Sequence, residues 1–125
     1  MLLSIAQITA EGILLAAKLG LDIDLVKEIN GNTSGTNGQF QVNYATKVLV
    51  GDTSPGFTLD LAHKDMSLAL EAADAFRLGL PVGAATHAVM GLARSSDYAG
   101  KDFTALLDFG AEMAGIEPPR LKKKA

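Results

Sequence analysis

The sequence contains no cysteine, and aromatic residues make up only 6% of its 125 positions. Without cysteine the chain can form neither disulfides nor thiolate metal sites, and this fits a reducing compartment. We therefore expect a cytoplasmic protein. Because 48% of the residues are hydrophobic while few are aromatic, the core is predicted to be aliphatic and rich in alanine.

A surplus of positive charge is also missing. The net charge is -3, and the basic residues cluster only in the last segment, RLKKKA, which is predicted to be a solvated terminus. This balance argues against nucleic acid or an anionic membrane as the main ligand. The two histidines, His63 and His87, do not form an HExxH pattern, so we predict no metal site.

Motifs for phosphate binding and for a nucleophilic serine are absent as well. The segment GNTSGTNG brings Gly31, Gly35 and Gly38 close together in the sequence. It is neither the GxGxxG turn of a dinucleotide-binding unit nor a loop that ends in GK[ST]. No serine stands in a GxSxG elbow. The glycine-rich segment is therefore predicted to be a loop between helices.

The first 20 residues, MLLSIAQITAEGILLAAKLG, are apolar but do not read as a membrane span. No basic region precedes them, and Gln7, Thr9, Glu11 and Lys18 interrupt the apolar run. A charged side chain near the centre of a bilayer helix is costly. We predict a buried helix over residues 1–19 that is central to a core or shared between subunits.

Apolar residues recur with helical spacing over most of the chain. Gly20 and Gly31 follow two of the periodic segments, as helix-ending residues do, and Pro81 stands where a first helical turn tolerates proline. The near-strand ATKVLVG is too short and isolated to form a sheet. The sequence thus predicts a single all-α domain over residues 1–125, a multi-helix bundle with helices at 1–19, 22–30, 38–49, 59–78, 82–93 and 103–114.

The stretch PGFTLDLAHKDMSLALEAA places Asp60, His63, Lys64 and Asp65 in the first turns of the fourth predicted helix. Asp60 and Lys64 are four residues apart with the acid first, a spacing that favours an exposed ion pair. Alternatively, Phe57, Lys64 and Asp65 converge at the edge of a cleft and form a site. Spacing alone leaves both interpretations open.

The same stretch resembles the C-terminal domain of the β-hydroxyacid dehydrogenases, in which an aromatic residue after Pro-Gly is followed by Lys-Asp and a small, aliphatic run. Here these positions are Phe57, Lys64, Asp65, Leu68 and Ala69. The opening MLLSIAQITAEGILLAAKLGLD is similar to the family's long helix, and LPVGAATHAVMGLARSSDYAGKDFTALLDF is similar to its last two helices. The resemblance covers essentially the whole chain and implies the all-α fold of 6-phosphogluconate dehydrogenase C-terminal-like domains.

The resemblance also implies a function. The cofactor would be NAD or NADP, and a hydride would pass between it and a small β-hydroxy acid or semialdehyde. If the family's residue roles apply here, Lys64 contacts the cofactor, Phe57 lines the nicotinamide and substrate pocket, and Asp65 orients groups in that pocket. The resemblance gives no role to His63, which we interpret as a satisfied or exposed histidine.

Family members also carry a Rossmann domain with GxGxxG and a segment with a general acid/base lysine, and neither pattern occurs in this sequence. Met1 would fall just after that lysine. We therefore expect an isolated C-terminal domain that is inactive alone, pairs with a Rossmann domain and forms a homo-oligomer, with a dimer expected, through residues 1–19. The alternative is a non-catalytic helical association module that uses the same apolar helix as its interface.

Overall fold

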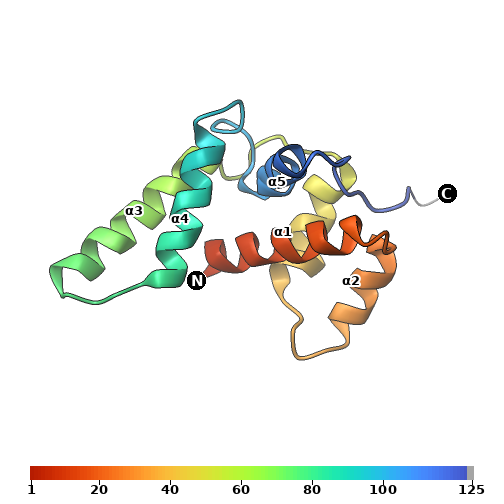
Figure 1. The fold of residues 1–125 in the computed structure, drawn as a ribbon, viewed down its shortest axis with the longest axis horizontal. Helices are drawn as coiled ribbons and strands as arrows, with labels where there is room; N and C mark the ends of the chain where they lie inside the picture. The colour runs from red at the N-terminus through yellow and green to blue at the C-terminus, as the bar shows by residue number, and fades with distance from the viewer. Residues whose placement is uncertain (124–125) are drawn as a thin grey trace.

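The computed structural model describes residues 1–123, and within them every regular element is helical (Figure 1). A single antiparallel bridge joins Thr58 to Asp102. The predicted all-α class is therefore confirmed. The α-helices are α1 (Leu2–Lys18), α2 (Ile23–Gly31), α3 (Leu59–Ala75), α4 (Pro81–Arg94) and α5 (Leu106–Ala114). The shorter elements are a π-helix, η1 (Gln39–Tyr44), and two 3-10 helices, η2 (Val48–Val50) and η3 (Phe103–Ala105).

Helix α1 is the central element and packs against α5, η1, α4 and α2. A Cβ atom at Gly110 of α5 would stand 2.5 Å from Leu14 Cδ1, so the missing side chain allows these two helices to approach closely. The buried face of α1 is small and aliphatic, with Leu3, Ala6, Ala10, Ile13 and Ala16. Its other face leaves the large apolar side chains of Ile8 and Leu15 exposed, and Leu19, which follows the helix, is exposed as well. In the described part of the chain no helix is long and apolar enough to cross a membrane.

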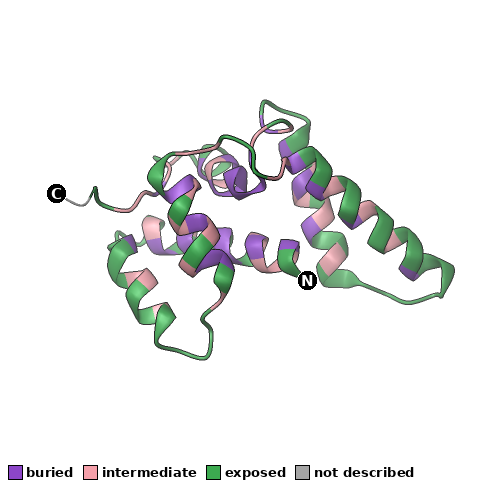
Figure 2. Ribbon diagram, turned by 180° about the vertical axis from the view of Figure 1, so that it is seen from behind, coloured by how far each residue is buried: buried purple, intermediate pink, exposed green. Residues whose placement is uncertain are grey.

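Helices α3 and α4 form a pair that extends away from α2 along the long axis of the molecule (Figure 1). Their far ends are largely exposed, whereas the buried residues gather where α1, α5 and η1 meet (Figure 2). Helix α3 ends at Ala75 rather than at the predicted Leu78. Arg77 adopts a left-handed conformation with φ 54°, and the Leu78 N–H donates to the Ala73 carbonyl at 2.9 Å, which closes the helix.

The segment predicted as a regular helix over residues 38–49 is helical, but it is not one α-helix. It begins as the π-helix η1 and ends as the 3-10 helix η2. The wider π turn carries Tyr44 into the core, where its hydroxyl donates to the Ala6 carbonyl of α1 at 2.9 Å. Burial, reinforced by the nearby Asp102, raises the pKa of Tyr44 far above its usual range, so the phenol is a neutral donor.

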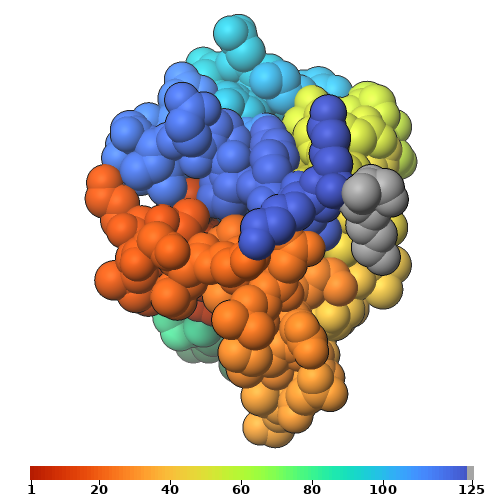
Figure 3. Space-filling model, turned by 90° about the vertical axis from the view of Figure 1, so that its right-hand side faces the viewer, coloured from red at the N-terminus to blue at the C-terminus, as the bar shows by residue number. Residues whose placement is uncertain are grey.

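The C-terminal segment is docked rather than frayed. Arg120 donates two hydrogen bonds to the Asp108 carboxylate, at 2.7 and 2.8 Å, and the Leu121 N–H donates to the Leu49 carbonyl at 2.9 Å. The segment lies across the surface between α5 and α2 (Figure 3). The prediction of a solvated RLKKKA terminus is thus wrong for Arg120 and Leu121, because both have partners in the body of the domain. The last two residues lie outside the described part of the chain.

Candidate functional site

Phe57 and Asp65 line one groove, of about 490 Å³, at the N-terminal end of α1. Its walls come from α1, η1, α3, η3 and the Pro-Gly-Phe turn. The described lining residues are apolar except for Asn43 and Asp65. The complete lining, which we call the Phe57 groove, is Met1, Leu2, Leu3, Asn43, Phe57, Asp65, Met66, Ala69 and Phe103.

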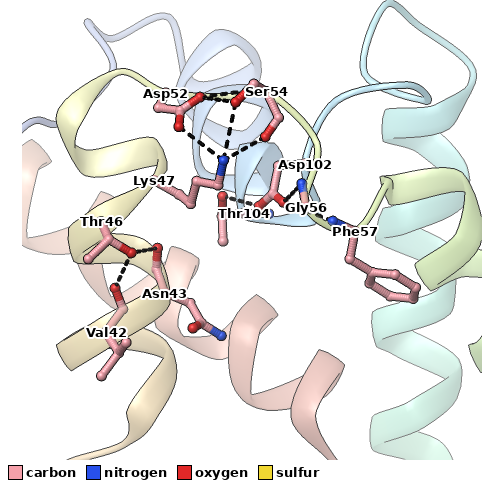
Figure 4. A network of polar contacts seen from close by, with 10 residues as sticks. All are labelled: Val42, Asn43, Thr46, Lys47, Asp52, Ser54, Gly56, Phe57, Asp102 and Thr104. Carbon is pink, nitrogen blue, oxygen red and sulfur yellow. Dashed lines mark hydrogen bonds and ion pairs between the residues drawn. The ribbon is translucent and has the colours of Figure 1, made fainter.

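A buried carboxylate holds the Pro-Gly-Phe turn in place (Figure 4). Asp102 is only 3% exposed. Its Oδ2 accepts hydrogen bonds from the backbone N–H groups of Gly56 and Phe57, at 3.0 and 3.2 Å. Its Oδ1 accepts from the N–H and the hydroxyl of Thr104, at 3.1 and 2.6 Å. These four donors compensate the charge that burial would otherwise penalise.

A backbone hydrogen bond and an aromatic contact also join the Pro-Gly-Phe turn to η3. The Phe103 N–H donates to the Phe57 carbonyl at 2.9 Å, and the Phe57 and Phe103 rings meet edge to face with centroids 6.0 Å apart. One residue further on, Thr58 caps α3 by accepting a hydrogen bond from the Leu61 N–H at 3.2 Å. The position of Phe57 in the groove and the start of α3 are therefore set together.

A second polar cluster closes the loop that leads into the Pro-Gly-Phe turn (Figure 4). Lys47 Nζ lies 3.0 Å from Asp52 Oδ2 and donates to the carbonyl and the hydroxyl of Ser54, at 2.8 and 3.2 Å. Hydrogen bonds from Ser54 and from Lys47 lower the pKa of Asp52 to about 2. None of these residues lines the Phe57 groove, so we assign the cluster to the loop's conformation.

Lys64 and Asp65 differ in their relation to the groove. Asp65 lines it, whereas Lys64 stands beside it and is not a lining residue. The Lys64 Nζ lies 3.6 Å from Asp65 Oδ1, and both side chains are more than half exposed. The predicted pair of Asp60 with Lys64 is wrong. Asp60 Oδ1 instead lies 2.5 Å from Arg94 Nη2, because α4 packs beside this face of α3 and supplies a second cation.

His63 is satisfied at the contact between α3 and α4, outside the Phe57 groove. Its ring stacks on His87 with centroids 4.1 Å apart, and its Nδ1 lies 3.0 Å from Arg94 Nη1. Burial, followed by the charges of His87 and Arg94, lowers the pKa of His63, so the ring is neutral at pH 7. In residues 1–123 no cluster of three or more histidine, aspartate or glutamate side chains is placed to hold a metal ion.

Phe57 and Asp65, which the sequence singled out, both line the groove, but the other polar and aromatic lining residues were not predicted. Asn43 was visible only as one of several amides in its segment, and Phe103 only as the start of a helix. Both reach the groove through contacts between distant parts of the chain, and the spacing of residues carries no signal for such contacts.

The groove suits a flat ring next to a small polar molecule. The aromatic pair of Phe57 and Phe103 offers an apolar wall for a ring, Asp65 offers a carboxylate, and Lys64 offers a cation for a phosphate group at the rim. The glycine-rich loop lies elsewhere, since Gly35 lines a separate pocket between α1 and α2. The groove therefore combines an aromatic wall with one carboxylate and, at its rim, one ammonium group.

The sequence is similar to those of known dehydrogenases and reductases. Residues 1–109 match the family model described as the NAD-binding domain of NADP-dependent 3-hydroxyisobutyrate dehydrogenase. The chain is 34% identical to 3-sulfolactaldehyde reductase of Escherichia coli over 93% of this chain and 39% of that protein. It is 31% identical to 2-(hydroxymethyl)glutarate dehydrogenase of Eubacterium barkeri over 86% of this chain and 36% of that protein. The chain thus spans less than two fifths of the length of these relatives.

Solved structures resemble the domain as well. The crystal structure of 3-hydroxyisobutyrate dehydrogenase from Salmonella typhimurium aligns with a TM-score of 0.78 and 26% identity, over 86% of this chain and 38% of that one. A 3-hydroxyisobutyrate dehydrogenase from Mycobacterium tuberculosis, described with L-serine, aligns with a TM-score of 0.73 and 27% identity, over 87% and 40% of the two chains.

Replacing Asp102 by asparagine should destabilise the domain. The amide offers a single acceptor oxygen and turns an NH₂ group toward other donors, so part of the network loses its partner, at a cost of about 2 to 4 kcal/mol. Urea unfolding followed by circular dichroism measures this cost. The matched control is Asp97→Asn, since Asp97 is exposed just before the same loop. Equal stability of the two variants would show that Asp102 does not hold the turn.

Proposed function

This chain belongs to the family of NAD-binding domains of NADP-dependent 3-hydroxyisobutyrate dehydrogenase, and on that premise we propose that it is the C-terminal domain of an NAD(P)-dependent β-hydroxyacid dehydrogenase. The substrate class is a small β-hydroxy acid or the corresponding semialdehyde. The observation that carries the proposal is the Phe57 groove, in which an aromatic wall, a carboxylate and a cation at the rim lie around one cavity.

Each site residue has a separate task in this proposal. The nicotinamide cofactor supplies the hydride chemistry when it is bound. Phe57 packs against the nicotinamide ring and excludes water from it. Lys64 binds a phosphate oxygen of the cofactor, since its ammonium group is exposed and its partner Asp65 lies 3.6 Å away. Asp65 orients polar groups of the substrate or of the residue that exchanges a proton with it.

The groove is half of a site. It opens at the start of α1, where Met1 and Leu2 form part of the lining. We propose that a Rossmann domain, located in the cytoplasm with this one, covers this opening and supplies the glycine-rich turn and the general acid/base lysine. The alternative of a purely associative helical module gives no reason for a carboxylate in an apolar groove with a cation at its rim, and we do not favour it.

Exposed apolar side chains on α1 support a homo-oligomer. Ile8 and Leu15 are 62% and 63% exposed, although the opposite face of the same helix is buried, and Leu19, just after the helix, is 67% exposed. We propose that a second subunit, together with the Rossmann domain, covers part of this face.

The first test of the proposed function is the kinetics of the assembled enzyme, in which this chain is joined to its Rossmann domain. Lys64→Ala removes a charge-assisted hydrogen bond to the cofactor, so the cofactor KM should rise by roughly ten- to a hundredfold. Asp65→Asn should lower kcat more than it changes the cofactor KM, because it disturbs orientation rather than affinity. The chain without its Rossmann domain should show no turnover.

Two exposed residues away from the groove provide matched controls. Lys18→Ala makes the same charge change as Lys64→Ala, and Asp74→Asn makes the same change as Asp65→Asn at the far end of α3. Both should behave like the unmodified enzyme. If Lys64→Ala binds the cofactor as tightly as Lys18→Ala does, the role proposed for Lys64 is wrong.

The second test concerns self-association. The chain should sediment as a dimer or larger species at micromolar concentration, and Ile8→Glu with Leu15→Glu should shift it toward monomer because charges on the exposed face of α1 oppose its burial. A control pair on another surface is Leu25→Glu with Ile29→Glu, which alters exposed apolar residues of α2. A monomeric unmodified chain, or equal dissociation by the two pairs, would contradict an interface on α1.

A further inference from the structure

Asn43 is the one neutral polar side chain among the described residues that line the Phe57 groove. It stands on the π-helix η1, across the groove from α3, which carries Asp65. Neither the sequence motif nor the proposed cofactor contacts of Phe57 and Lys64 give it a task. A polar group on an otherwise apolar wall must either face water or recognise a polar group of a ligand.

The orientation of Asn43 is fixed by its own helix. Its Nδ2 donates to the Oε1 of Gln39 at 3.0 Å, and Gln39 is itself buried. The next residue, Tyr44, is anchored in the core by its hydrogen bond to the Ala6 carbonyl. The hydrogen bond to Gln39 therefore orients the Asn43 amide, and the anchored Tyr44 holds the backbone next to it. Pre-orientation of this kind strengthens recognition, because binding then orders little that was free before.

One side of the Asn43 amide remains available. Within residues 1–123 the bond to Gln39 is the hydrogen bond of the Asn43 side chain, so its Oδ1 atom and the second N–H of its Nδ2 are uncommitted. The amide points away from the hydrogen bonds that Thr46 makes to the backbone of η1 (Figure 4). An acceptor and a donor side by side complement a hydroxyl group, which both donates and accepts.

The charge around the groove restricts the ligand further. Asp65 is its charged lining side chain among the described residues, and it is negative. The nearby cation, Lys64, is exposed, stands outside the lining and faces Asp65 at 3.6 Å. A side group with its own negative charge would add a second anion to the substrate's carboxylate and would meet Asp65 and a neutral amide, with no cation among the described residues that line the groove. Such a group is disfavoured by like-charge repulsion and incomplete solvation.

We propose that Asn43 is a specificity-determining residue that selects β-hydroxy acids whose side group is a neutral hydroxyl, in preference to an alkyl or an anionic side group. This inference rests on the proposed dehydrogenase function and adds the substrate class to it. The recognised group is the substituent on the carbon that bears the carboxylate. The oxidised hydroxymethyl group and the carboxylate are common to all substrates of the class.

Three acids that share this framework form the test series. Glycerate carries a hydroxyl side group, 3-hydroxyisobutyrate a methyl group of similar size, and 2-(hydroxymethyl)glutarate a carboxyethyl group. The assembled enzyme should oxidise glycerate with a kcat/KM at least about tenfold above that of the other two, since a site built to bond a hydroxyl discriminates strongly against its loss. The measurement is the initial rate of nicotinamide reduction with saturating cofactor.

Asn43→Leu, with a side chain of similar size, should lower the glycerate to 3-hydroxyisobutyrate ratio of kcat/KM by roughly ten- to a hundredfold and leave the cofactor KM unchanged. Asn43→Ala should shift the ratio in the same direction and serves if the leucine variant folds poorly. The matched control is Gln41→Leu. Gln41 belongs to the same π-helix, but its amide donates to the Lys27 carbonyl and to Asn30 outside the groove, so its loss should not change the ratio.

The outcomes separate the inference from the function on which it rests. Turnover with an unchanged ratio in Asn43→Leu, or a wild-type preference for 2-(hydroxymethyl)glutarate, overturns the role of Asn43 and leaves the dehydrogenase function standing. Absence of turnover with all three acids overturns the proposed function and the inference together. A ratio that falls equally in Gln41→Leu would assign the effect to the fold of η1 and would overturn the inference.

Discussion

The buried carboxylate of Asp102 is the interaction on which the candidate site depends. It ties the Pro-Gly-Phe turn to η3 by accepting four hydrogen bonds, from Gly56, Phe57 and Thr104. A carboxylate with 3% exposure is costly unless its acceptors are filled, and here the donors come from two segments far apart in the sequence. Any conformation that moves the turn away from η3 leaves the Oδ2 atom of this carboxylate without its two donors, which couples the position of Phe57 to the stability of the domain.

Helix α1 supports the Phe57 groove, because it packs against the other helices and contributes lining residues. Its small residues allow α5 and η1 to approach closely, and its first residues form part of the Phe57 groove. The same helix therefore belongs to the core on one face, to the groove at its start and to an exposed apolar surface on the other side. This threefold use explains why its sequence is apolar around most of its circumference without being a membrane span.

The sequence predicted the helical class and most helix limits because these follow from local signals. Gly20 and Pro81 punctuate the chain where α1 ends and α4 begins, and the resemblance in the Pro-Gly-Phe and Lys-Asp segment led to the groove. Long-range contacts account for what was missed. The partner of Asp60 is Arg94 on another helix, and the docked Arg120 finds Asp108. The π-helical form of η1 accompanies the hydrogen bond from the buried Tyr44 hydroxyl to Ala6 of α1, a long-range contact that no spacing rule encodes.

We propose above all that the Phe57 groove holds the reacting end of the cofactor and the substrate. A crystal structure of the assembled enzyme with oxidised nicotinamide cofactor and glycerate tests it most directly. We predict the nicotinamide ring within about 4 Å of the Phe57 side chain, an ordinary packing distance. We also predict the Lys64 ammonium in hydrogen-bond contact with a cofactor phosphate. A bound nicotinamide with no atom of cofactor or substrate against the groove's lining residues would contradict this role of the groove.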